Sequence, residues 1–206
     1  SVSEPDPALL PVRFFRLFLD TLIAELGRES LETVLEKADL PADLVDPQTV
    51  SGYTSQSAMR TYARIQKAMR VYYGRGARGA LTRIGRLMWT RLLESASISD
   101  RAQFQFVRTL PPNMRRKSAL ELLARFMREK PTAVSVHTLD MDYMLVDHAS
   151  AATGQGGSTP ICYVTLGLIQ ENLFWATARE HDIDEVSCCA SEGHVCEFRI
   201  KLEGKG

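Results

Sequence analysis

The chain lacks a net charge and any long apolar run. Its 206 residues carry 25 Lys and Arg against 25 Asp and Glu, so no global attraction to nucleic acid or anionic lipid is expected. No segment approaches the roughly 18 consecutive apolar residues of a membrane span. The first residues, Ser1 to Pro7, show neither the basic nor the apolar region of a signal peptide. We therefore expect a cytoplasmic protein without a membrane span or a nucleic-acid partner.

Cysteine is scarce, and its four copies all lie in the last quarter of the chain, at Cys162, Cys188, Cys189 and Cys196. In a reducing cytoplasm, cysteines are more often metal ligands, buried apolar side chains or redox groups than structural disulfides. Glu185 lies among them, and three thiolates with one carboxylate suit a closed tetrahedral Zn²⁺ site. The sequence therefore predicts a structural zinc ion held by Cys162, Glu185, Cys188 and Cys196.

The apolar pattern changes period along the chain. Helical spacing is expected over residues 11–38, 54–97 and 100–130, with breaks at Gly27, at 73–76 and at Pro111–Pro112. After that, short β-rich runs at 133–137 and 143–147, and again at 183–189 and 195–202, predict two hairpins with a helix over 161–179 between them. This order predicts an α+β fold in which helices pack on an antiparallel sheet. We expect a helical N-terminal segment, residues 1–52, and a ligand-binding domain, residues 53–206.

The hairpin over the last two predicted strands brings Cys188 near Cys196. Side chains alternate between the faces of a strand, so Glu185 and Cys188 share a face only if a bulge or a twist interrupts the strand. Two other interpretations stay open. The cysteines are buried apolar side chains, or Cys162 is a nucleophile at a helix N-terminus with His181 or His194 as its base.

At these positions the chain resembles the vinyl-4-reductase domain family, which is found in phenol-sensing activators and in a bacteriochlorophyll-biosynthesis protein. The resemblance covers about residues 75–202 and is carried by Pro160–Cys162, Gly167, Glu185–Cys188, Gly193–His194 and Cys196–Phe198. The cluster residues are separated by 23, 3 and 8 positions, as are the zinc ligands of the phenol sensors. The resemblance implies a zinc-stabilised, Bet3-like fold around an apolar pocket.

Aromatic and histidine side chains are the candidates for that pocket, because small-molecule sites are mostly apolar with a few directed polar groups. The candidates are Trp89, Phe104, Phe126, His137, Tyr143, His148 and Phe174. An arginine-rich run from Arg75 to Arg91 offers guanidinium groups to a carboxylate, although a solvated helix face is the simpler interpretation. It lacks the preceding strand and the lysine of a phosphate-binding loop.

The sequence thus favours a non-catalytic binding protein, a sensor or carrier for a hydrophobic or aromatic molecule, with a tetrapyrrole among the candidates. The alternative is an enzyme or accessory protein of bacteriochlorophyll synthesis that acts on a vinyl group. The chain shows neither a dinucleotide fingerprint nor a ferredoxin-type cysteine array, which counts against an unaided reductase. An assembly subunit is a third class, and the helical N-terminus is compatible with a homodimer.

Overall fold

The computed structural model describes residues 10–128, 133–148, 162–187 and 196–202. Its helices are α1 (Val12–Leu26), α2 (Arg28–Lys37), α3 (Ser55–Tyr73), α4 (Ala77–Glu94), α5 (Ile98–Thr109), α6 (Pro112–Met127) and α7 (Tyr163–Thr177). Short 3-10 turns are η1 (Ala42–Val45), η2 (Pro47–Gly52) and η3 (Gly74–Gly76). The strands are β1 (Val134–Leu139), β2 (Asp142–Asp147), β3 (Ile183–Ser187) and β4 (Cys196–Ile200). The predicted α+β fold is confirmed.

Local signals in the sequence set the ends of these helices. Gly27 adopts a φ of 80° between α1 and α2, and Gly74 adopts a φ of 55° after α3, a region that glycine enters without a Cβ clash. Thr54 caps α3 and forms a reciprocal capping box with Ser57. Pro112 occupies the first turn of α6, where its missing N–H costs no helical hydrogen bond. The breaks expected at Gly27, 73–76 and Pro111–Pro112 are therefore confirmed.

The four strands form one antiparallel sheet in the order β1-β2-β4-β3. The two predicted hairpins join through β2 and β4, where Leu145 lies opposite Phe198. The pairing of β3 with β4 shifts register between Glu185 and Ser187. The interruption expected from the sequence concerned the faces of Glu185 and Cys188, and Cys188 lies outside the described residues, so that expectation stays a prediction.

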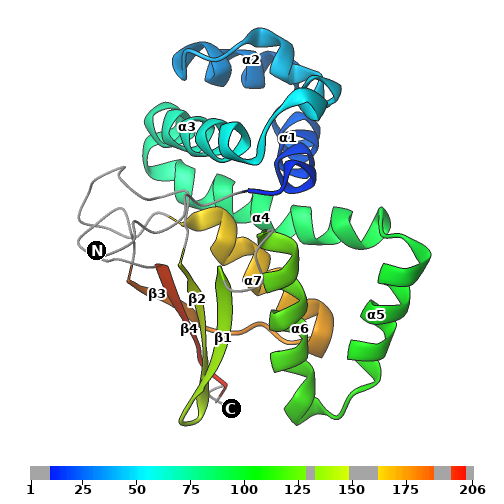
Figure 1. The fold of residues 1–206 in the computed structure, drawn as a ribbon. Helices are drawn as coiled ribbons and strands as arrows, with labels where there is room; N and C mark the ends of the chain where they lie inside the picture. The colour runs from blue at the N-terminus through cyan, green and yellow to red at the C-terminus, as the bar shows by residue number, and fades with distance from the viewer. Residues whose placement is uncertain (1–9, 129–132, 149–161, 188–195, 203–206) are drawn as a thin grey trace, which may run out of the picture.

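The helices are arranged around α4 and α7 (Figure 1). Helix α7 packs on α4 and on α6, α6 in turn packs on β1, and α1 packs on the other side of α4. Helix α5 lies at the far edge from β3, and Val107 is its only buried residue. No helix in the described part combines the length and apolarity needed to cross a bilayer. The proposed division at residue 52 stays a prediction.

Helices α4 and α7 approach so closely that their backbones touch at two glycines. A Cβ atom at Gly85 would overlap the carbonyl oxygen of Val164, and a Cβ atom at Gly167 would overlap the carbonyl oxygen of Thr82. Because each collision involves backbone, no side-chain rotation can relieve it. The crossing therefore requires glycine on both helices.

We predict that Gly85→Ala lowers the free energy of unfolding by about 3 kcal/mol or more, because the new methyl group forces the two helices apart. Gly79→Ala is the matched control in the same helix, since a Cβ atom added at Gly79 would meet nothing within 4 Å. That substitution leaves stability unchanged or raises it by up to about 1 kcal/mol. Urea unfolding of both variants checks the prediction, and equal stabilities would contradict it.

Candidate functional site

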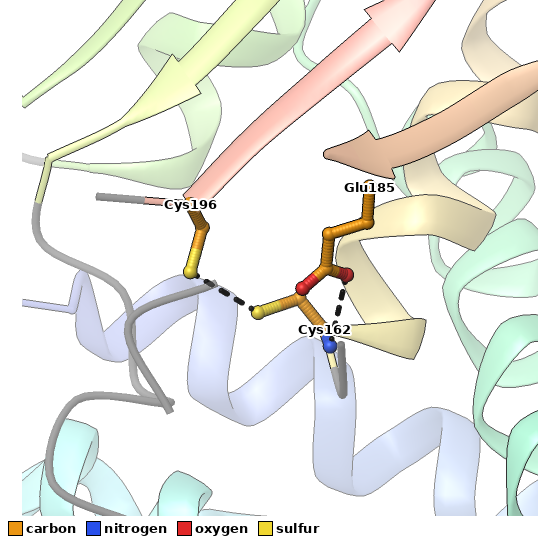
Figure 2. A group of neighbouring side chains, drawn as sticks. All are labelled: Cys162, Glu185 and Cys196. Carbon is orange, nitrogen blue, oxygen red and sulfur yellow. Dashed lines mark hydrogen bonds between the residues drawn. The ribbon is translucent and has the colours of Figure 1, made fainter. Parts of the chain in front are cut away.

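Two thiols and one carboxylate converge where α7 meets the last hairpin (Figure 2). The Sγ atoms of Cys162 and Cys196 lie 3.4 Å apart. The Oε2 atom of Glu185 accepts a hydrogen bond of 3.1 Å from the backbone N–H of Cys162. One ligand atom from each residue lies within 4.8 Å of the other two. Both cysteines are buried, with 7% of Cys162 and none of Cys196 exposed.

Three different elements supply this cluster. Cys162 is the N-cap residue of α7, so its sulfur lies beside the positive end of the helix dipole. Cys196 opens β4 opposite Asp147, and Asp147 forms a buried ion pair of 2.7 Å with Arg128. Glu185 lies at the bulge of β3. The structure therefore unites three of the four residues predicted to bind a metal, and their role as ligands stays a prediction.

The remaining cluster candidates are placed differently or fall outside the described residues. Cys188, Cys189 and His194 lie outside the described ranges. His181 follows the opposite end of α7 from Cys162, and a helix of this length separates its ends by roughly 20 Å. His181 is therefore not placed to serve as a base for Cys162.

The ligand candidates do not gather in one place. Trp89 is fully buried and packs edge-on against Phe104 and Trp175. Tyr143 is buried beneath α6 and donates a hydrogen bond of 3.4 Å to the carbonyl of Asn113.

Three further candidates lie on the surface. His137 and His148 are exposed and both contact the Ser135 hydroxyl, at 2.8 and 3.2 Å, and Phe174 is 40% exposed on α7. The remaining two candidates, Phe104 and Phe126, share a cavity.

That cavity has a volume of about 550 Å³ and lies between α1, α5, α6 and the end of α4. Its apolar lining consists of Leu17, Leu92, Ala96, Phe104, Leu122 and Phe126. Its polar lining consists of Arg13, Ser95, Asp100, Gln103 and Arg125. The size falls within the range of roughly 300–1,000 Å³ that is usual for small-molecule sites.

None of these five polar residues was a candidate from the sequence, and two of them, Arg13 and Arg125, are cationic. The guanidinium of Arg13 lies 5.8 Å from the centre of the Phe126 ring, which is a cation–π distance. Within the described ranges, neither Arg13 nor Arg125 forms an ion pair with a carboxylate. Exposed arginines are common on helices, so no sequence signal distinguished these two.

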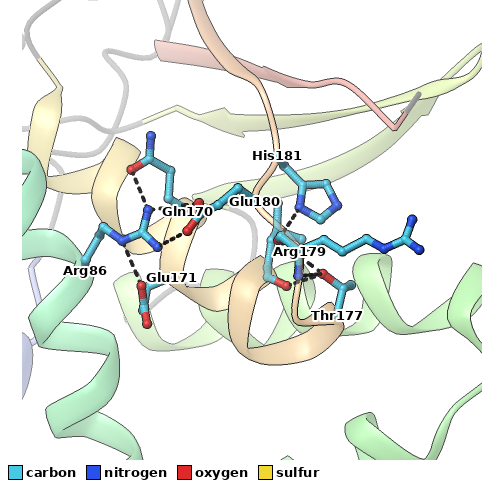
Figure 3. Close-up of polar contacts among 8 residues, drawn as sticks. Arg86, Gln170, Glu171, Thr177, Arg179, Glu180 and His181 are labelled. Carbon is cyan, nitrogen blue, oxygen red and sulfur yellow. Dashed lines mark hydrogen bonds and ion pairs between the residues drawn. The ribbon is translucent and has the colours of Figure 1, made fainter. Parts of the chain in front are cut away.

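The arginine run on α4 has a structural role instead (Figure 3). Arg86 donates to Glu171 at 2.8 Å and to Glu180 at 2.6 Å. Arg83 pairs with Glu25 at 3.0 Å. These arginines tie α4 to α7 and to α1, which leaves less of their charge for a ligand.

No protein-family model and no curated protein sequence matches the chain. Solved structures do match in fold. One from work on the function of heme distortion in the H-NOX family has a TM-score of 0.57 and 14% identity, and the match covers 93% of this chain and 94% of that one. One from work on modulating heme redox potential through porphyrin distortion has a TM-score of 0.51 and 15% identity, over 90% and 96% of the two chains. An H-NOX variant matches with a TM-score of 0.50 and 14% identity, over 91% and 92%.

These matches show a shared fold, and they correct several expectations from the sequence. The resemblance to the vinyl-4-reductase family is wrong, because the similar structures are H-NOX domains and no family model supports the resemblance. The zinc cofactor and the link to bacteriochlorophyll synthesis that came with it are wrong as well, since the similar proteins are described as heme proteins. The three intervals between the four residues match the zinc motif of the phenol sensors, but this match does not identify the family of the chain.

The described residues do not fit a heme in the cavity. Proteins hold heme iron through His, Cys, Met or Tyr, and none of these residue types lines it. Within the described ranges, His137, His148 and His181 lie on the sheet surface or beyond the end of α7. The contact of Gly85 and Gly167 also leaves no space for a planar ring between α4 and α7.

His181, which follows α7, makes the stability of the fold depend on pH. Burial, and next the charge of Arg116, lower the pKa of His181 below its ordinary value of 6.5. Its Nε2 atom accepts a hydrogen bond of 2.9 Å from Arg116 Nε, which requires that nitrogen to be unprotonated. The folded chain therefore binds a proton at His181 less readily than the unfolded chain does.

We predict that this contribution to stability is present above about pH 6.5 and is lost as the pH falls below it, because protons then favour the unfolded state. Between about pH 7.5 and pH 5, the free energy of unfolding falls more steeply in the wild type than in His181→Gln, whose amide oxygen can still accept from Arg116. Urea unfolding across this range checks it, and parallel pH profiles would contradict it.

Proposed function

We propose that the chain is a non-catalytic sensor module whose cavity between α1, α5 and α6 binds a small aromatic acid. The observation that carries the proposal is the placement of two arginines, Arg13 and Arg125, in the lining of a cavity that also holds two phenylalanine rings. Guanidinium groups bind carboxylates through charge-assisted hydrogen bonds. An apolar lining that includes Phe104 and Phe126 suits an aromatic ring.

The other polar groups of the cavity indicate which further functional group the ligand carries. Asp100 accepts a hydrogen bond of 2.9 Å from the Ser97 hydroxyl and keeps further acceptor capacity. Gln103 can donate as well as accept. A hydroxyl group on the ligand, opposite its carboxylate, would find a partner in either side chain.

Helix α5 is the element that supports a sensing role. It supplies Asp100, Gln103 and Phe104 to the cavity, yet Ile98 and Phe106 on the same helix are 89% and 65% exposed. A second depression, between α5 and α6, shares Gln103 and Arg125 with the cavity. A helix with so little buried surface opens at low free-energy cost. Ligand contacts from α5 would therefore draw it toward α6 and change the surface it presents.

The fold supports this assignment by analogy alone, since the proteins of similar fold are described as heme-containing H-NOX domains. Within the described ranges, the cavity has no side chain that could bind heme iron. We therefore propose an organic acid as its ligand, and not heme. No set of described residues forms a nucleophile, base and oxyanion site in this cavity, which favours binding over catalysis.

We predict saturable binding of 4-hydroxybenzoate, measured by calorimetry or by the fluorescence of Trp89 and Trp175, which pack with Phe104 behind the cavity. Arg125→Gln and Arg13→Gln each weaken binding about tenfold, the effect of losing one charge-assisted hydrogen bond at a partly exposed site. Arg108→Gln, on the exposed side of α5, is the matched control and leaves affinity unchanged. The uncharged 4-hydroxybenzamide binds at least tenfold more weakly.

Two outcomes would overturn this function. One is the absence of saturable binding by any of a panel of aromatic acids. The other is a one-to-one hemin complex with a shifted Soret band, since that would require an axial ligand of the kind the cavity lacks. Hydrogen exchange reports on the proposed output, with slower exchange of α5 amides expected when ligand is bound.

A further inference from the structure

We propose that Cys162 and Cys196 form a reversible disulfide, which makes the start of α7 an oxidation-sensitive site. The inference does not depend on the ligand cavity. It rests on two sulfur atoms 3.4 Å apart that come from positions 34 residues apart in the chain. A disulfide bond needs a separation of about 2.05 Å, so a small movement of the two side chains suffices.

The surroundings hold both sulfurs in place. Glu185 binds the backbone N–H of Cys162, which fixes the start of α7 against β3 (Figure 2). Cys196 is held by the β2–β4 pairing opposite Asp147, and the Arg128 ion pair buries that carboxylate. Two sulfurs fixed at contact distance react with each other faster than with a second molecule.

The difference in exposure assigns a role to each cysteine. Cys162 is 7% exposed and Cys196 is fully buried, so a small oxidant such as hydrogen peroxide reaches Cys162 first. The Cys162 thiolate attacks one peroxide oxygen, the O–O bond breaks, and the products are a sulfenic acid and hydroxide, which takes up the thiol proton as water. The Cys196 sulfur then attacks the Cys162 sulfur, and the S–O bond breaks. The hydroxide leaves with the Cys196 proton as a second water.

The two sulfurs together lose two electrons, and the peroxide gains them. The new bond ties the N-terminus of α7 to β4. A thiol reductant reverses the step by exchange.

The test uses the full chain, reduced and then freed of reductant, and treated with hydrogen peroxide with and without a metal chelator. We expect loss of two thiols per chain, a mass decrease of two hydrogen atoms, and a Cys162–Cys196 crosslink by peptide mapping. The oxidised protein melts roughly 5–10 °C higher than the reduced protein, because the bond restricts the unfolded chain. Dithiothreitol returns it to the reduced value.

Variants separate this pair from the remaining cysteines. Cys162→Ser and Cys196→Ser each abolish the crosslink and the shift in melting temperature, while Cys188→Ser and Cys189→Ser retain both. The proposal is overturned by a crosslink through Cys188 or Cys189, or by a gain of oxygen mass at Cys162 without a crosslink. It is also overturned if the thiols react only after the chelator is added, since a bound metal would then occupy the sulfurs. None of these measurements uses a cavity ligand, so their failure leaves the proposed function untouched.

Discussion

The contact of two helix backbones at Gly85 and Gly167 sets the rest of the arrangement. Any larger residue at either position would meet a carbonyl of the opposite helix. The distance between α4 and α7 at their crossing is therefore fixed by these two glycines. Arg86 reinforces that crossing through Glu171 and Glu180. The start of α7 is thereby fixed beside the terminal hairpin, and the end of α4 is directed to the cavity. Both candidate sites thus depend on one pair of helices.

Local features of the fold could be predicted from the sequence because local chemistry determines them. Gly27, Gly74 and Pro112 each mark a break that backbone geometry requires. The bulge of β3 between Glu185 and Ser187 was expected only on the assumption that Glu185 and Cys188 share a face as zinc ligands, and strand periodicity alone did not predict it. The homodimer, in contrast, has no observation here that tests it and stays a prediction.

Features that join distant segments could not be predicted in this way. Arg13 and Arg125 belong to different helices, and only tertiary packing brings them to one cavity. The need for glycine at Gly85 and Gly167 depends on the backbone of the opposite helix, which the sequence alone does not place. The family resemblance failed for a related reason: a motif of four residues at three intervals constrains a few side chains and leaves most of the fold unspecified. The structural match, in contrast, compares the arrangement of more than nine tenths of the chain.

The bulge in β3 has a consequence for the surface of the molecule. β3 is an edge strand and carries Val186, which is 50% exposed. A regular apolar edge of this kind would offer its free amides and carbonyls to another chain and promote aggregation. The shifted register at Glu185 and Ser187 interrupts that row of hydrogen-bonding groups, and Asp184 and Lys201 add charge beside it. The strand that supplies the Glu185 carboxylate to the two sulfurs is therefore also a poor template for intermolecular strand addition.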